Sequence, residues 1–208
     1  IAIVPSRRTR DPEDVDISWE IDAFNFDLPL MASAMDGVVS PATAIEIGRL
    51  GGVGVLNLEG LWTRYEDPDT LFAEIAELPP EKATLRMQDI YSAPIIPDLI
   101  GERIRQIKDA GVVSCASVTP QRTEAFAKEL LDAEPLNLKR FVRELDIPVI
   151  VGGCASYQAA LHLMRTGAAG VLVGVGPGHA CTTRAVLGLG VPQATAIADA
   201  RAARMRHL

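Results

Sequence analysis

The stretch GVLVGVGPGHACTTR, which spans Gly170 to Arg184, contains the strongest signal of fold and chemistry in this sequence. Its first four residues form an apolar run typical of a buried strand. Glycines at 174, 176 and 178 follow, and they remove side chains over a short arc so that the backbone can face a ligand closely. The arc delivers one thiol, Cys181, followed by two hydroxyls and a guanidinium. Because α/β barrels carry their nucleophiles on loops at the carboxyl ends of strands, this stretch predicts an enzyme of the α/β class.

Outward from this stretch, strand and helix patterns alternate along the chain. Apolar runs predict strands at residues 28–33, 53–57, 112–118, 149–151 and 170–173. Helical patterns cover residues 41–50, 67–78, 97–110, 120–132, 135–145, 156–166 and 193–206. Pro41 suits the first turn of its helix, and Gly111 would end another. A repeated strand-then-helix order, with strands apolar on both faces, predicts a buried parallel sheet.

The alternation breaks once, near Glu134 and Pro135. Two helical patterns follow each other there with no strand between them, which would put two parallel neighbours out of order. The predicted strands are also fewer than those of a closed barrel, which has eight strands and typically about 250 residues. These features fit either an incomplete (β/α)8 TIM barrel that forms a single domain over residues 1–208, or a different fold. The break indicates that residues are missing near 134/135.

The composition excludes several classes of protein. The 208 residues are 48% hydrophobic, which is enough for one sizeable core. A net charge of −7, with acidic residues scattered along the chain, argues against nucleic-acid binding through a basic face. Three cysteines without paired spacing argue against a disulfide framework or a zinc site, and no apolar run approaches the ~20 residues of a membrane span. We expect a cytoplasmic protein with neither a nucleic acid nor a membrane as partner.

Several further segments can be compared with a known family. VIVGGCA at residues 149–155 leads through a helix to the opening stretch, and GLGVPQ follows it at 188–193. LPLMASAMD at 28–36 and GGVGVLN at 51–57 lie near the two first predicted strands. Together these segments resemble the IMP dehydrogenase / GMP reductase family. The resemblance implies an incomplete (β/α)8 TIM barrel over residues 1–208, with one strand missing near residues 134/135 and further strands beyond Leu208. VPSRRTR at 4–10 and EPLNLK at 134–139 are most similar to the short bacterial branch of that family, which has no CBS-domain insertion.

This resemblance implies covalent chemistry at Cys181. In the family, the thiolate adds to C2 of a purine nucleotide, hydride leaves to NAD, and the covalent thioimidate is then hydrolysed. Thr183 resembles the threonine that helps to position the attacking water. The family's loop also offers backbone carbonyls to a monovalent cation, usually potassium. Those carbonyls would come from Gly176, Gly178 and Cys181.

The resemblance also implies which residues contact the nucleotide. The candidates are Ser33, Met35, Gly152, Gly153, Gly178, His179 and Ala180. Met35 could equally fill a core, and the cysteines at 115 and 154 are expected to be small buried hydrophobes. Two positions depart from the family pattern, because many members carry Asn in place of Gly153 and Ser in place of His179. No residue of this sequence is matched to the family's nicotinamide site.

The function that the resemblance implies is NAD-dependent oxidation of IMP to XMP. It also implies a homotetramer, and in some members of the family two tetramers pair into an octamer. GMP reductase, which runs the same covalent adduct in reverse with NADPH and releases ammonia, is the nearest alternative. A flavin-dependent barrel oxidoreductase has a similar Gly-Gly strand end but does not need Cys181. A non-catalytic paralogue that binds purine nucleotides is a third alternative, motivated by Gly153 and His179.

Overall fold

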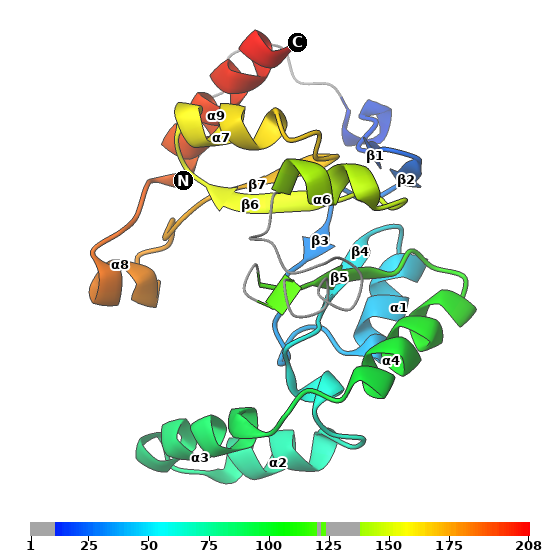
Figure 1. The fold of residues 1–208 in the computed structure, drawn as a ribbon, viewed down its shortest axis with the longest axis vertical. Coiled ribbons are helices and arrows are strands. Elements are labelled where there is room, and N and C mark those ends of the chain that lie inside the picture. The colour runs from blue at the N-terminus through cyan, green and yellow to red at the C-terminus, as the bar shows by residue number, and fades with distance from the viewer. Residues whose placement is uncertain (1–10, 120–121, 124–137) are drawn as a thin grey trace. The chain divides into compact units, whose positions relative to one another are not determined.

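The computed structural model describes residues 11–119, 122–123 and 138–208. These residues fall into two compact units (Figure 1). Unit 1 contains residues 11–20 and 24–119, and unit 2 contains residues 21–23, 122–123 and 138–208. Most of the predicted helix 120–132, the start of the predicted helix 135–145 and the break near residues 134/135 lie outside the described residues.

Unit 1 is built on a three-stranded parallel sheet. Its strands are β3 (Met31–Ala32), β4 (Val53–Asn57) and β5 (Cys115–Ser117), in the order β3-β4-β5. Met31 pairs with Val53, and Val55 with Cys115. Strand β4 matches its predicted bounds, whereas β3 and β5 are shorter than the apolar runs 28–33 and 112–118 that predicted them. Apolar residues also flank β3 and β5, so the apolar runs extend beyond the paired residues and overestimate the length of each strand.

Helix α1 (Pro41–Arg49) packs directly on β4. The Ser40 hydroxyl accepts the Thr43 N–H at 3.0 Å and so caps the helix, and Pro41 occupies the first turn as expected. A Cβ at Gly54 would lie 2.6 Å from Cα of Ala44, so strand and helix approach more closely than a larger residue allows. The core beside them contains Val39, Ala44, Leu56 and Ile107. Ile107 comes from helix α4 (Pro97–Asp109), which ends before Gly111 at φ +78°.

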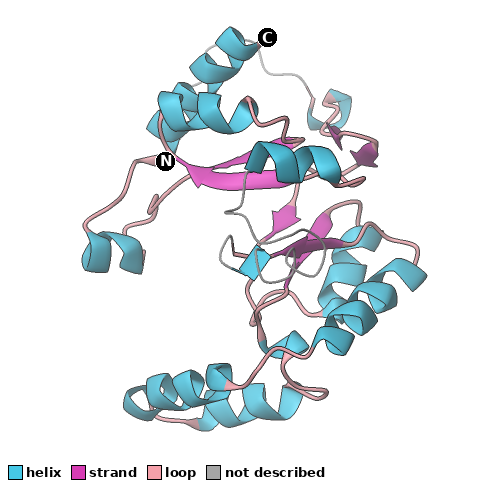
Figure 2. Ribbon diagram, in the orientation of Figure 1, coloured by secondary structure: helices cyan, strands magenta, loops and turns pink. Residues whose placement is uncertain are grey.

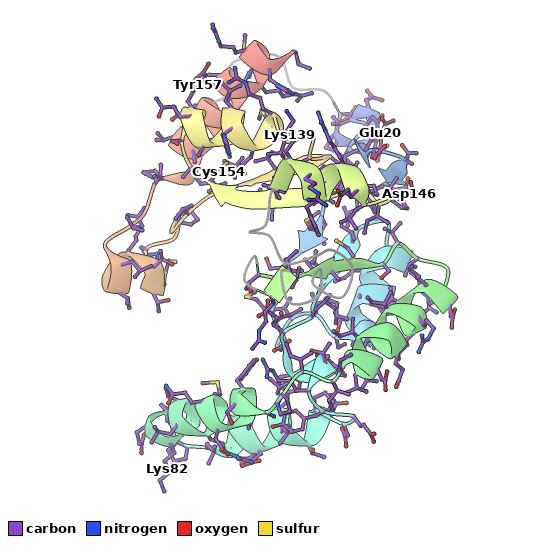
Figure 3. All side chains as sticks on the ribbon, in the orientation of Figure 1. Glu20, Lys82, Lys139, Asp146, Cys154 and Tyr157 are labelled. Atoms are coloured by element: carbon purple, nitrogen blue, oxygen red, sulfur yellow. The ribbon has the colours of Figure 1, made fainter. Side chains whose placement is uncertain are left out.

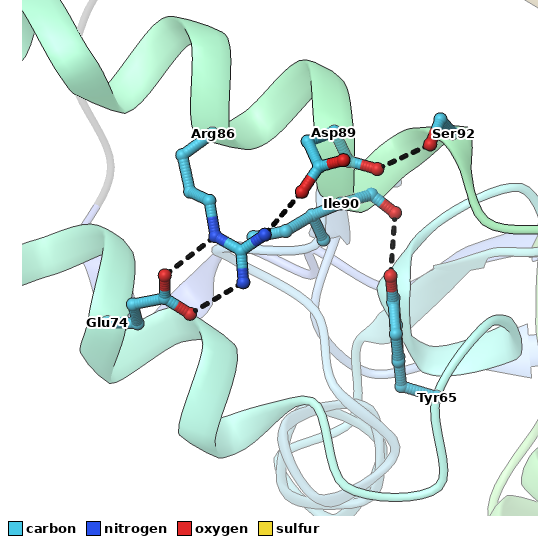
Figure 4. A network of polar contacts seen from close by, with 6 residues as sticks. All are labelled: Tyr65, Glu74, Arg86, Asp89, Ile90 and Ser92. Carbon is cyan, nitrogen blue, oxygen red and sulfur yellow. Dashed lines mark hydrogen bonds and ion pairs between the residues drawn. The ribbon is translucent and has the colours of Figure 1, made fainter.

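Two helices stand between β4 and α4. They are α2 (Asp69–Glu77) and α3 (Pro80–Ser92), and they follow the 3-10 turn η2 (Leu61–Thr63). Helix α3 was not among the predicted helices, and Ile90 is its one buried residue. Arg86 joins the two helices: its guanidinium donates to both carboxylate oxygens of Glu74, at 2.6 and 3.0 Å (Figure 4).

The first described residues of the chain form three short elements. They are the 3-10 turn η1 (Pro12–Asp14) and the strands β1 (Trp19–Ile21) and β2 (Phe24–Phe26), which pair with each other. The Trp19 ring stacks on Phe26 with centroids 4.8 Å apart, and its indole N–H donates to the Leu28 carbonyl at 2.8 Å. These contacts fix the segment that directly precedes β3.

Unit 2 contains a parallel pair of strands covered by helices (Figure 2). The strands are β6 (Ile150–Cys154) and β7 (Gly170–Val173). The helices are α6 (Leu138–Glu144), α7 (Tyr157–Met164), α8 (Thr182–Leu187) and α9 (Gln193–His207). Helix α8 was not predicted, because six residues are too few to show a periodic pattern.

The core of unit 2 lies between β6, α7 and α9. Its buried members are Cys154, Ala160, Leu161, Ala200 and Ala203. The alanines let α7 and α9 pack closely, and Cys154 stands at the end of β6 just before α7 (Figure 3). The described residues therefore form a mixed α/β fold with parallel strands, as expected from the sequence. None of the helices described here has the length and apolar character needed to cross a membrane.

Candidate active site

The carboxyl ends of β6 and β7 lie at one edge of their sheet because the two strands are parallel. The Gly174 N–H donates to the Cys154 carbonyl at 2.7 Å and so ties the exit of β7 to the end of β6. Gly152 and Gly153 are exposed here, and backbone rather than side chains forms the surface. This edge offers main-chain atoms to a ligand, as the sequence predicted for Gly152 and Gly153.

The lack of a side chain at position 153 has a local explanation. A Cβ on Gly153 would lie 2.8 Å from the carbonyl oxygen of Gly174, and one on Gly152 would lie 2.5 Å from Cβ of Leu172. Both neighbours belong to β7 or its exit and cannot rotate away. The close approach of the two strand ends therefore excludes any side chain at 153 in this backbone.

Cys181 begins helix α8 at the end of the glycine-rich loop and is partly exposed. The pKa of its thiol is lowered from the ordinary value. The main cause is a hydrogen bond from the Thr183 side chain, followed by the backbone N–H of the same residue. Desolvation opposes this lowering of the pKa, and the backbone and charge of Arg184 make smaller contributions that lower it further. An accessible thiol with a stabilised thiolate is the state that a nucleophile requires.

The other two thiols lie in different surroundings. Cys154 is 4% exposed in the core of unit 2, and burial raises its pKa. Cys115 lies in β5 of unit 1, where burial likewise raises the pKa of the thiol. Both environments favour the neutral thiol. Cys154 is buried as predicted, whereas Cys115 is only half-buried. Of the three cysteines, Cys181 alone has its pKa lowered.

Gly178, His179 and Ala180 form the exposed tip of the loop before Cys181. A Cβ on Gly178 would meet no atom within 4 Å, so there is open space beside the loop. The side chain of His179 is exposed. The tip is therefore accessible to a ligand, although its contacts with the nucleotide stay predictions.

The three carbonyls predicted to hold potassium already accept hydrogen bonds. The Gly176 oxygen accepts the Nε–H of Arg184 at 2.5 Å. The Gly178 oxygen accepts the Cys181 N–H, and the Cys181 oxygen accepts the Arg184 N–H, both at 3.3 Å. A guanidinium on Gly176 repels a second cation, so these residues do not fit a potassium ion as they are arranged. Among the described residues, no group of His, Cys, Asp and Glu side chains could hold a metal ion either.

Ser33 and Met35 lie in unit 1, directly after β3. Met35 is 53% exposed and Ser33 is also exposed, so Met35 does not fill a core. The Met35 N–H donates to the Ser33 carbonyl at 2.8 Å, and the Met35 carbonyl accepts the N–H groups of Val38 and Val39. This turn presents the two side chains at the carboxyl end of a parallel strand, where α/β enzymes bind ligands.

Sequence reasoning missed the contacts that hold this turn. Asp36 accepts the Leu61 N–H at 3.1 Å and the hydroxyl of Tyr91, a residue of the unpredicted helix α3. Burial, and then the hydrogen bond to Asp36, raises the pKa of Tyr91. Asp36 and Tyr91 are 55 positions apart, so no local pattern could have linked them.

Gln193 is a second residue whose role was missed. Its side-chain amide donates to the Val173 carbonyl at 2.8 Å, which holds the exit of β7 against the start of α9. The segment GLGVPQ, which ends at this glutamine, was noticed only as part of the family resemblance. The signal in the sequence that could have indicated this role was a polar residue directly after Pro192.

Comparisons with known proteins agree with this geometry. Residues 1–207 match the model of the IMP dehydrogenase / GMP reductase domain. Uncharacterized oxidoreductases of Mycolicibacterium smegmatis and Mycobacterium leprae are 45% and 46% identical, with all of this chain aligned to 63% of each relative. The inosine-5'-monophosphate dehydrogenase of Borreliella burgdorferi is 25% identical over 96% of this chain and 58% of that protein.

A solved structure gives the same result. The IMP dehydrogenase/GMP reductase-like protein of Corynebacterium glutamicum aligns with a TM-score of 0.89 and 41% identity, over 100% of this chain and 60% of that one. The chain thus spans somewhat less than two thirds of the relatives it matches. The match of nearly every residue to one domain model decides the assignment. This chain belongs to the IMP dehydrogenase / GMP reductase family of oxidoreductases.

Proposed function

We propose that this protein oxidises IMP to XMP with NAD, through a covalent adduct on Cys181. The observation that carries the proposal is the contrast among the three thiols. Burial raises the pKa of Cys115 and Cys154, whereas the pKa of Cys181, which is partly exposed on a glycine-rich loop, is lowered. Membership of the family adds that such a loop belongs to enzymes acting on purine nucleotides.

The first half of the reaction uses the Cys181 thiolate. Its sulfur forms a bond to C2 of the hypoxanthine ring, and the C2 hydrogen departs with its electron pair. Bound NAD supplies the acceptor for that hydride. The described residues do not define a nicotinamide site, so no residue of this chain is assigned to hold it. The product of this half-reaction is a thioimidate that joins sulfur to C2.

The second half uses Thr183. Before the reaction its side chain hydrogen-bonds to the thiolate. Once sulfur is bonded to carbon it carries no full negative charge, and the Thr183 hydroxyl becomes available to a water molecule. Water adds to C2, the carbon–sulfur bond breaks, and the thiolate is restored with release of XMP and a proton. The Thr183 hydroxyl would thus hydrogen-bond first to the thiolate and then to the attacking water.

The nucleotide would be held mainly by backbone. Gly152 and Gly153 present main-chain atoms at the strand ends, and the loop tip 178–180 presents further ones. The proposal assigns Ser33 to the phosphate or ribose and Met35 to the underside of the base. Exposure of both side chains supports this assignment. Potassium at the loop carbonyls would require Arg184 to leave Gly176, so no step is assigned to that ion.

The architecture proposed for the whole domain is a TIM barrel without a CBS insertion, assembled into homotetramers. Parallel strands alternating with helices support the barrel, as does the likeness to the Corynebacterium glutamicum structure. GMP reductase is the second candidate, since it shares the family and the adduct on cysteine. The two candidates differ in the nucleotide and in the redox cofactor that they consume.

The test compares two substrate pairs on the purified protein. IMP with NAD should yield NADH, whereas GMP with NADPH should leave NADPH unchanged. Cys181→Ser should abolish NADH formation, while Cys115→Ser, a change at a thiol outside the loop, should retain it. An intact-mass measurement should find IMP-derived mass on the wild type and none on Cys181→Ser. Undiminished NADH formation by Cys181→Ser would refute the proposal.

A further inference from the structure

The loop that carries Cys181 is closed at its base by three polar contacts. The Val191 N–H donates to the Val175 carbonyl at 3.0 Å. The amide of Gln193 donates to the Val173 carbonyl at 2.8 Å. The third contact is the Nε–H of Arg184 on the Gly176 carbonyl, at 2.5 Å. The segment 176–190, with α8 inside it, therefore leaves and re-enters the unit at one narrow place, which we call the neck.

Arg184 fills the neck between two glycines. A Cβ on Gly190 would lie 2.7 Å from both Cγ and Nε of Arg184, and 2.9 Å from the Gly176 carbonyl oxygen. A Cβ on Gly176 would lie 2.7 Å from the carbonyl oxygen of Leu189, and Gly176 is buried at φ +53°. Both positions therefore exclude side chains, and the space they leave is occupied by the Arg184 stem and guanidinium.

The same residue is linked to the nucleophile. Arg184 lies three positions after Cys181 on α8, and its N–H donates to the Cys181 carbonyl at 3.3 Å. Its side chain reaches back from α8 to the entrance of the loop at Gly176. Loss of the side chain would leave two contacts at the neck, Val191 to Val175 and Gln193 to Val173, and both lie outside the segment 176–190. Thr183, which hydrogen-bonds to the thiol, lies on that same short helix.

We propose that Arg184 is a positioning residue: its guanidinium clamps the neck of the loop and thereby keeps Cys181 and Thr183 in reactive geometry. This inference rests on the proposed role of Cys181, but it concerns how the loop is held rather than the substrate. The clamp requires the Nε–H and the planar fork, which lysine lacks, in addition to positive charge.

The experiment measures alkylation of each cysteine by iodoacetamide across a range of pH, with peptide mass spectrometry. It compares wild type, Arg184→Lys, Arg184→Met and Arg201→Met, the last being a control at an exposed arginine of α9. Both Arg184 variants should alkylate Cys181 several-fold more slowly at neutral pH, with the profile moved to higher pH. Arg201→Met should match the wild type.

Cys154 serves as an internal control for folding, because it lies in the core of unit 2. It should stay protected in every variant. Three results would overturn the clamp: wild-type rates in both Arg184 variants, wild-type rates in Arg184→Lys alone, or reactive Cys154 in either. The second result would show that charge suffices, and the third that Arg184 holds the whole unit rather than the loop.

Turnover separates this inference from the proposed function. If IMP is the substrate, Arg184→Lys should lower kcat with little change in KM, because Arg184 is not assigned to the nucleotide. A fall in affinity alone would contradict a positioning role. Suppose that the Arg184 variants alkylate more slowly than the wild type, but that the wild type never oxidises IMP. This pair of results would refute the proposed function and leave the clamp supported.

Discussion

Replacing Gly54 with alanine tests the packing of β4 against α1, on which unit 1 is built. The added Cβ would lie 2.6 Å from Cα of Ala44 and 2.9 Å from its Cβ. Rotation of a side chain cannot relieve a contact with a helix backbone, so strand or helix has to move. Overpacking of this kind costs about 1–3 kcal/mol, while alanine recovers about 0.4–1 kcal/mol by restricting the unfolded chain. We expect a net loss of about 1–2 kcal/mol of unfolding free energy.

The assay is urea unfolding followed by tryptophan fluorescence. Both tryptophans of the chain, Trp19 and Trp62, lie in unit 1, so the signal reports on that unit. Gly37→Ala is the matched control, because a Cβ there would meet no atom within 4 Å. Gly54→Ala should lower the midpoint with an unchanged slope, and Gly37→Ala should leave it unchanged or raise it.

The packing argument would be refuted if Gly54→Ala and Gly37→Ala had the same urea unfolding midpoint. That result would mean that β4 and α1 have room for a methyl group between them, contrary to the contact with Ala44. A lowered midpoint with a changed slope would instead show that the unfolded or native state had altered in compactness. Only the first outcome contradicts the packing argument.

Three further predictions follow from particular contacts. Thr183→Val should raise the pKa of Cys181, since it removes the largest cause of the lowered value, so alkylation of Cys181 should begin at higher pH than in Thr183→Ser. Arg103→Met should destabilise unit 1 by about 1–3 kcal/mol in urea unfolding, because this nearly buried guanidinium donates to carbonyls at 3.1 and 2.6 Å that would lose their partner. Arg86→Gln should leave the urea midpoint unchanged within error, because its pairing with Glu74 is exposed to solvent (Figure 4).

The elements predicted best were those with continuous apolar runs and clear ends. Strands β4 and β7 have their predicted bounds, and α1 begins at the proline expected in its first turn. Helix α3 escaped prediction although Ile90 is buried in it; two of its contacts are polar, from Arg86 to Glu74 of α2 and from the Tyr65 hydroxyl to the Ile90 carbonyl. Burial does not distinguish it from α2, which was predicted although none of its residues is buried.

The candidate site was predicted in its parts but not in its connections. Cys181 could be singled out because three glycines precede it within a few positions, and its role as a nucleophile stays a prediction. The contact of Arg184 with Gly176, and that of Tyr91 with Asp36, could not be read from spacing. The first depends on how the loop re-enters the unit, and the second on a helix that the sequence pattern did not indicate.

By itself, the sequence determined the alternation of parallel strands with most of the helices, the place of Cys181 after β7 and the family to which the chain belongs. These properties depend on residues that are near neighbours along the chain. Only the tertiary structure decided which of the thiols has its pKa lowered, why position 153 has no side chain and what closes the base of the glycine-rich loop. Each of those depends on contacts between separate segments, whose distances no local pattern encodes.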